Sequence, residues 1–372
     1  MALPSPRDPA ELRATLTDWL SEKVGEPVEL GEPGGAPASG FSNETILIDA
    51  VWDDGEGSGP VIHGLVLRVQ PTDHAVFPDG RFDAQHRVMA ALGAHTDVPV
   101  PQLRWFEDDP TVLGSPFMVM GRVDGEAPSD TPPYSTEGWL KDAGPEVQSA
   151  VWGRGLDAMA AVHGADWRAL DLADLDPVPD GGSRLCARVE EMAAMLQWAS
   201  PDVRQAVPEA GLAWLRDNQP PDIDDPALCW GDSRIGNQLF AGRQAAATVR
   251  VAAVLDWEMV HVGDPVQDLG WFTWMDHTLS AGLEQPRLPG FPPTGATLER
   301  WEAATGRSAA HHRWAEILAG VGFAVVMVRL TALLKGSELF PPESDFERSN
   351  MGCVALERAL ADLDVHPSDM ER

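Results

Sequence analysis

Cys229-Trp-Gly-Asp-Ser-Arg-Ile-Gly-Asn-Gln-Leu-Phe240 is the stretch of the chain that carries the most information. It places Asp232 and Asn237 on one short turn, with four residues between them. The apolar run at 249–255 follows and ends immediately before Asp256. Asp and Asn are common turn formers, so each of these elements alone is weak evidence. In this order, with a strand between them, they are a specific signal.

This spacing suits phosphoryl transfer from ATP. The reaction needs a carboxylate that orients the attacking hydroxyl and takes its proton, and oxygen ligands that hold Mg²⁺ against the phosphates. The turn supplies a carboxylate and an amide on one loop, and Asp256 at the strand end supplies a second carboxylate. Protein kinases divide the same tasks between a catalytic loop and a metal-binding segment. The segment Gly263-Asp-Pro-Val-Gln-Asp268 adds a third acidic element.

The composition excludes several classes of protein. Lys plus Arg is 27 and Asp plus Glu is 58, which gives a net charge of −31. A general nucleic-acid binder or a binder of anionic membranes needs a basic surface, so we expect neither partner. The longest apolar run, at 317–328, has 12 residues, whereas a membrane span needs about 20. Three scattered cysteines argue against a disulfide framework or a zinc cluster.

The length of 372 residues predicts roughly two lobes at about 150 residues each. Residues 1–120 combine a helical pattern at 8–24, a hairpin of β-branched runs at 45–52 and 61–69, and one further helix from residue 82. Residues 121–372 have mostly helical spacing, with a short hairpin around the Asp232 turn. We therefore predict an α+β, two-lobed protein in the cytoplasm, with its site between the lobes.

Gly-Asp-x4-Asn, the strand ending in Leu-Asp-Trp-Glu and Gly-Asp-Pro-x-x-Asp together resemble the aminoglycoside phosphotransferase and choline kinase-like family. The likeness covers about residues 27–340. It implies a protein-kinase-like fold, with a small β-rich N-lobe and a larger helical C-lobe. It further implies that Asp232 is the catalytic base, that Asn237 and Asp256 are Mg²⁺ ligands, and that ATP is the phosphoryl donor. Asp264 and Asp268 would then be mainly structural.

The small lobe departs from the family pattern at its phosphate anchor. A kinase-like lobe brings a basic residue on a strand to the ATP phosphates and pairs it with a helix Glu. The chain has three lysines, and none lies on a predicted small-lobe strand. Arg68 is the basic residue in the right strand context, and its guanidinium can bind phosphate with two N–H groups. Gln85 stands where the helix Glu is expected, and it brings no charge.

Two further segments bear on the site. The phosphate-covering loop is expected at 38–45, where Ser42 and Asn43 can donate hydrogen bonds to phosphate oxygens. Trp230 occupies the position where many relatives have His, and we expect it to pack without the hydrogen bonds of an imidazole. Arg234 fits either neutralisation of the transferred phosphate or a surface salt bridge.

The predicted function is Mg-ATP-dependent transfer of the γ-phosphoryl group to a hydroxyl of a small molecule. Two alternatives stay open at this point. The departures at Arg68, Gln85 and Trp230 fit a nucleotide-binding pseudokinase without activity. Some relatives use lipid-like alcohols, so a kinase for hydroxyacyl thioesters is also consistent. The oligomeric state cannot be predicted from the sequence.

Overall fold

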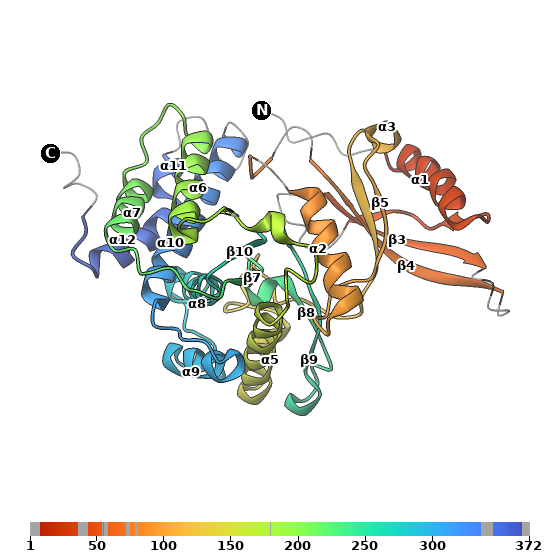
Figure 1. The fold of residues 1–372 in the computed structure, drawn as a ribbon. Coiled ribbons are helices and arrows are strands. Elements are labelled where there is room, and N and C mark those ends of the chain that lie inside the picture. The colour runs from red at the N-terminus through yellow and green to blue at the C-terminus, as the bar shows by residue number, and fades with distance from the viewer. Residues whose placement is uncertain are drawn as a thin grey trace.

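The computed structural model describes residues 8–35, 44–53, 55, 59–71, 75–78, 81–178, 180–335 and 345–366. It has an antiparallel sheet in the first third of the chain and a large helical region after it (Figure 1). The predicted α+β, two-lobed, kinase-like fold is therefore confirmed. The sequence-based boundary at residue 120 stays a prediction.

The small lobe is built on a sheet in which β1 (Glu29–Leu30), β3 (Glu44–Asp53), β4 (Pro60–Val69), β6 (Phe117–Gly121) and β5 (Leu103–Glu107) lie in this spatial order. The short β2 (Gly34–Gly35) also pairs with β3. Buried and more exposed side chains alternate along β3, which is the period of a sheet with one face in a core. All of these pairings are antiparallel.

Helices cover both faces of this sheet. On one face, α1 (Pro9–Val24) starts at the Asp8 cap and buries Leu12, Leu16, Trp19 and Leu20 in a core with β3, β4 and β6. On the other face, α2 (Phe82–His95) shares a core with β6 and with large-lobe residues. Figure 1 shows α2 between the sheet and the helical lobe. The small and large lobes are therefore joined by one continuous apolar core.

The large lobe is organised around α10 (His312–Leu334). The helices α6 (Arg184–Ala199), α7 (Ala206–Asp217), α8 (Val266–Thr278) and α12 (Met351–Ala361) pack against it. Outside this group, α5 (Pro145–His163) packs against α9 (Thr294–Thr305). The single-turn helices are α3 (Pro110–Leu113), α4 (Trp139–Asp142) and α11 (Phe346–Ser349).

Among the described residues, α10 is the one helix long and apolar enough to cross a membrane by length and composition. The 12-residue apolar run in the sequence understates it, because the helix extends beyond that run at both ends. In the structure, 61% of its most apolar window is buried inside the protein. Helices that form the centre of a globular core have this pattern.

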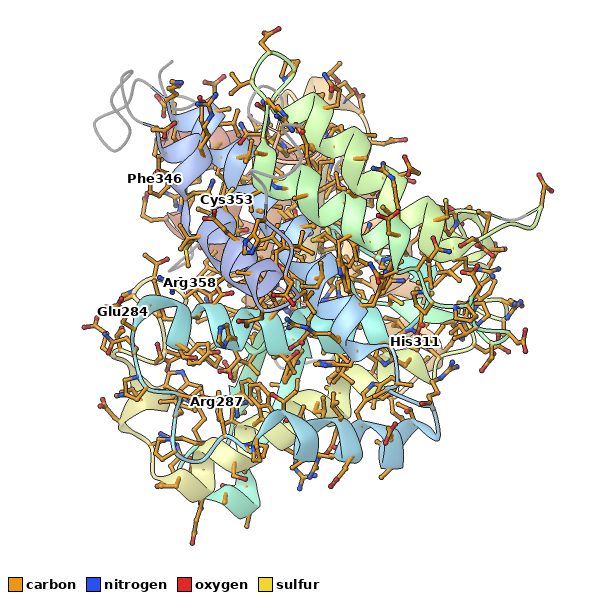
Figure 2. All side chains as sticks on the ribbon, turned by 90° about the vertical axis from the view of Figure 1, so that its left-hand side faces the viewer. Glu284, Arg287, His311, Phe346, Cys353 and Arg358 are labelled. Atoms are coloured by element: carbon orange, nitrogen blue, oxygen red, sulfur yellow. The ribbon has the colours of Figure 1, made fainter. Side chains whose placement is uncertain are left out.

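The segment between α8 and α9 is fastened to the large lobe by Arg287. Its guanidinium contacts Asp276 of α8, which also accepts a hydrogen bond of 2.9 Å from the Tyr134 hydroxyl. The same guanidinium lies over the rings of Trp152 and Phe291. Figure 2 shows this side of the molecule, with Arg287 on the segment below α8 and Cys353 and Arg358 on the helix above it. This network holds the segment between α8 and α9 against α8 and against Trp152.

Two small two-stranded sheets bring the informative sequence segments together. The strand β7 (Ala227–Cys229) pairs with β10 (His261–Gly263), and β8 (Gln238–Ala241) pairs with β9 (Arg250–Val254). Both pairs are antiparallel. The turn that contains Asp232 and the turn that contains Asp256 therefore lie next to each other.

Gly270 sets how closely α8 can approach α10. A Cβ atom at this position would lie 2.6–2.8 Å from atoms of Ala315. We expect Gly270→Ala to lower the free energy of unfolding by about 1–3 kcal/mol, because the helices must move apart. Chemical denaturation of wild type and variant measures this change.

The matched control is Gly295→Ala on α9, where nothing lies within 4 Å of the added Cβ. There the same substitution should leave stability unchanged or raise it by up to about 1 kcal/mol, because Ala favours the helix. Equal losses at the two positions would contradict the close packing of α8 on α10.

Candidate active site

The catalytic-loop candidate begins directly after β7. Gly231 has a φ of +93°, and a Cβ there would lie 2.3 Å from the carbonyl oxygen of Met259. Only glycine satisfies both conditions without strain. The chain then turns through Asp232 into a short 3₁₀ helix, Ile235–Asn237, that leads into β8. This local geometry places Asp232 and Asn237 on one compact loop.

A buried carboxylate on α8 fixes the backbone of that loop. Asp268 accepts hydrogen bonds from the backbone N–H of Trp230 at 2.6 Å and of Gly231 at 2.8 Å. It also contacts Nε2 of His163 at 2.9 Å. The indole N–H of Trp301 donates to Nδ1 of His163, so Nε2 carries the imidazole proton and donates it to Asp268. These hydrogen bonds hold the pKa of Asp268 below its usual value despite burial.

Three donors hold the side chain of Asp232. The indole N–H of Trp271 donates to Oδ1 at 2.7 Å, and the amide of Asn237 donates to Oδ2 at 2.6 Å. Nε of Arg234 lies 2.9 and 3.1 Å from the two oxygens, and the same guanidinium contacts Asp130. Arg234 is therefore paired with the candidate base itself, and it is not a surface salt bridge.

Burial and the nearby Asp256 raise the pKa of Asp232 to about 7. Desolvation penalises the carboxylate form, and a second negative charge adds to the penalty. The hydrogen bonds from Trp271 and Asn237 act in the opposite direction. A carboxyl group that titrates near neutral pH is suited to accept a proton in a reaction.

Asn237 and Asp256 offer the oxygen atoms that Mg²⁺ prefers. The Asn237 amide nitrogen donates to the Asp232 backbone oxygen at 3.1 Å and to its carboxylate. The Asn237 side-chain oxygen is the end left to act as a ligand. The backbone N–H of Leu255 donates to the Asn237 carbonyl at 2.8 Å, which ties the two segments together. This donor set fits a hard divalent cation.

Asp256 has an unusual backbone conformation. Its φ of +61° lies in the left-handed region, which few residues other than glycine adopt. Asp tolerates this region better than most side chains, but the conformation still stores strain. Nη2 of Arg68 reaches it from β4, at 3.1 Å from Oδ1. The contact joins the small lobe to the second turn of the large lobe.

Trp230 packs in the core as expected, and it also donates hydrogen bonds that the sequence did not indicate. Its ring is fully buried, and its indole N–H donates to the carbonyls of Leu255 at 2.8 Å and Asp256 at 3.2 Å. The indole therefore ties the Asp232 loop to the Asp256 turn through one N–H group. The physical reason is that an indole has a donor, although it lacks the acceptor nitrogen of an imidazole.

The structure brings together Asp232, Asn237, Asp256 and Arg68, and their roles stay predictions. Gln85 lies on α2 and is 2% exposed. Ser42 and Asn43 fall outside the described residues. Trp271 was missed by sequence reasoning, although it lies three positions after Asp268 and so on the same face of one helix. Asp130 gave no sequence signal.

Two adjoining hollows lie beside the loop. The first is lined by Gly231, Trp271 and apolar side chains that include Met192, Met259 and Leu318. The second is a cavity of about 320 Å³ between the start of α2 and α6. Four arginines line it (Arg81, Arg87, Arg184 and Arg188), together with three carboxylates (Asp83, Asp174 and Glu191). Both are lined by Arg188 and His261, so they meet at these two residues.

A family model described as "Phosphotransferase enzyme family" matches residues 36–317. The chain belongs to this phosphotransferase family. The resemblance read from the Asp232, Asp256 and Asp268 segments is thereby confirmed. At the level of the family, the protein is a phosphotransferase.

Among curated proteins, the chain is 26% identical over 358 residues to the probable acyl-CoA dehydrogenase IBR3 of Arabidopsis thaliana, which covers 90% of this chain and 41% of that protein. It is 32% identical over 209 residues to the acyl-CoA dehydrogenase family member 11 of Gallus gallus, which covers 56% of this chain and 25% of that protein. The chain therefore spans less than half the length of these relatives.

Solved structures share the fold. A Ralstonia eutropha protein assigned to the aminoglycoside phosphotransferases superimposes with a TM-score of 0.67 and 22% identity, covering 93% of this chain and 98% of that one. A thermostable aminoglycoside phosphotransferase in a ternary complex with ADP and hygromycin B has a TM-score of 0.54 and 16% identity, with coverages of 93% and 98%. At these identities the likeness supports the architecture.

The raised pKa of Asp232 predicts a pH-dependent stability. Between its ordinary value near 3.8 and the folded value of about 7, the folded protein keeps a proton that the unfolded chain has lost. The free energy of unfolding therefore falls as the pH rises through that window. Above about pH 7 the folded protein bears the whole penalty for burying the ionised Asp232. In the metal-free protein, we expect Asp232→Asn to raise the unfolding midpoint at pH 8 by about 2–4 °C and less at pH 5.

Thermal unfolding followed by circular dichroism at both pH values checks this expectation. Asp202→Asn, at an exposed position, controls for the loss of one negative charge from a strongly acidic protein. A gain for Asp232→Asn that is the same at pH 5 and pH 8 would contradict the assignment.

Proposed function

We propose that the protein is an Mg-ATP-dependent phosphotransferase that moves the γ-phosphoryl group to a hydroxyl of a small molecule. The observation that carries the proposal is the meeting of Asp232, Asn237 and Asp256 on two adjacent turns, with Arg68 reaching them from the sheet. Membership of the phosphotransferase family supports phosphotransfer as the class of reaction. We infer the nucleotide, the metal and the acceptor from the arrangement of these side chains.

Asp232 orients the acceptor hydroxyl and takes its proton. The hydroxyl oxygen bonds to the γ-phosphorus while the bond between this phosphorus and the bridging oxygen of ADP breaks. Trp271 and Asn237 hold the carboxylate in place from either side. Arg234 already lies against Asp232, so its guanidinium is positioned to meet negative charge on the transferred group.

Asn237 and Asp256 would hold Mg²⁺, which supplies charge neutralisation for the phosphates when bound. Arg68 is positioned to anchor phosphate oxygens, and its buried Nε has no hydrogen-bond partner in the part of the chain that the structure describes. An unpaired buried donor is unfavourable until an acceptor arrives. A phosphate oxygen is such an acceptor, which supports a nucleotide at this place.

The roles of metal ligand and base can be tested separately with two variants. Asp256→Ala is expected to abolish Mg-dependent ATP binding, because a metal ligand is lost. Asp232→Asn is expected to bind Mg-ATP like wild type and to lower turnover by about 10²–10⁴-fold, because only the base is lost. Calorimetric titration with ATP, with and without Mg²⁺, measures the first effect, and ADP release measures the second.

Unchanged Mg-ATP affinity in Asp256→Ala would contradict the role of Asp256 as a metal ligand. Wild-type turnover in Asp232→Asn would contradict the role of Asp232 as the base. The pseudokinase alternative has its own outcome: Mg-ATP binds to wild type, but no hydroxyl compound raises ADP release. Absence of nucleotide binding with and without Mg²⁺ would contradict both readings.

A second candidate acceptor is a hydroxyacyl thioester with an anionic carrier. The curated relatives are named acyl-CoA dehydrogenases, and this chain matches less than half of their length. The apolar hollow beside the Asp232 loop has a volume of only about 20 Å³, too small for an acyl chain, so the candidate rests on the adjoining arginine-lined cavity of about 320 Å³. Each of the four arginines already contacts a carboxylate: Arg81 and Arg188 contact Glu191, Arg87 contacts Asp174, and Arg184 contacts Asp176.

Arg188 tests this candidate because it is 9% exposed and lines both hollows. With a hydroxyacyl-CoA as acceptor, Arg188→Met should raise the KM for the thioester by about tenfold, because a charge-assisted contact is lost. The KM for ATP should not change. Arg313→Met, at an exposed position paired with Glu316, is the matched control. ADP release with an aminoglycoside and not with the thioester would exclude the candidate.

A further inference from the structure

Arg68 and Asp256 form an ion pair that occupies the candidate metal position from the side of the small lobe. Nη2 of Arg68 lies 3.1 Å from Oδ1 of Asp256, and the two side chains are 15% and 16% exposed. An exposed pair at this distance is weak, but a largely buried one is screened much less by water and salt. The chain thus supplies its own cation to Asp256.

The part of the chain that the structure describes contains no group of three His, Cys, Asp or Glu side chains that could hold a metal. Mg²⁺ takes about six oxygen ligands in near-octahedral geometry. Asn237 and Asp256 would supply two protein side chains, so most of the ligands must come from phosphates and water. Without nucleotide, a metal ion therefore finds only two protein side chains as ligands at this site.

That metal ion must also displace Arg68. Removing one partner of a buried ion pair leaves an uncompensated charge, which is costly. Nucleotide phosphates can take the place of the Asp256 carboxylate, because they offer acceptor oxygens to a guanidinium whose buried Nε has no hydrogen-bond partner among the described residues.

We propose that Arg68 is an internal counter-ion of Asp256 that makes metal binding depend on nucleotide. In the empty site it neutralises Asp256 and keeps free divalent ions out. When the nucleotide binds, Arg68 moves to the phosphates and Asp256 becomes available to the metal. The inference rests on the proposed function, since it concerns the same nucleotide site.

The test uses Mn²⁺ alone and ADP alone as separate probes. In Arg68→Met, Mn²⁺ affinity without nucleotide should rise by about tenfold, whereas ADP affinity without metal should fall by about tenfold. Electron paramagnetic resonance of free Mn²⁺ measures the first and calorimetry the second. A merely structural role for Arg68 would weaken both or neither. Arg68→Lys keeps the charge and should leave the Mn²⁺ affinity near wild type.

The matched control is Arg122→Met, which removes one charge from an ion pair with Asp49 at 2.8 Å, at the end of the neighbouring strand. It should change neither affinity. Arg68→Gln is a second neutral variant, to be used if circular dichroism shows that Arg68→Met does not fold. Mn²⁺ affinity that is unchanged or lower in the folded neutral variant overturns the proposal.

The outcomes also separate this inference from the function on which it rests. If wild type binds ADP neither alone nor with Mn²⁺, the nucleotide site itself is wrong and both proposals fall. If wild type binds ADP with Mn²⁺ and the neutral variants gain no affinity for Mn²⁺ alone, the counter-ion role falls and the phosphotransferase proposal stands.

Discussion

The buried carboxylate of Asp268 is the constraint on which the candidate active site depends. A carboxylate at this depth must be fully hydrogen-bonded, and its partners are the backbone N–H groups of Trp230 and Gly231 and the ring of His163. Backbone groups cannot change rotamer, so this arrangement fixes the course of the main chain before Asp232. The positions of Asp232 and Asn237 follow from it.

Helix α8 therefore serves the site twice. Asp268 holds the backbone of the loop, and Trp271, one turn later, holds the Asp232 carboxylate itself. The helix can do both because Gly270 lets it lie close against α10 at the centre of the large lobe. A site built on a packed helix is more rigid than one built on loops alone. Its geometry is thus tied to the core of the lobe.

The sequence predicted the fold class and the segments that meet, because Asp232, Asn237 and Asp256 are spaced around a strand in a way that chance seldom produces. It did not predict the partners of these side chains. The pairing of Arg68 with Asp256 and of Arg234 with Asp130 joins residues far apart along the chain, and local patterns carry no information on such contacts. The hydrogen bonds of Trp230 were missed because an aromatic residue was read by its size, and its N–H group was not considered.

The shared core around α2 has a consequence for the folding of the chain. Val88, Met89 and Leu92 pack in one cluster with Leu228, Trp257 and Val262 of the large lobe. A fragment that stopped at the end of β6 would expose this apolar surface to water, and exposed surface of this kind promotes aggregation. The small lobe is thus unlike an autonomous module that could be cut out and transplanted, and a ribosome-bound chain would complete it only after residue 262 had emerged.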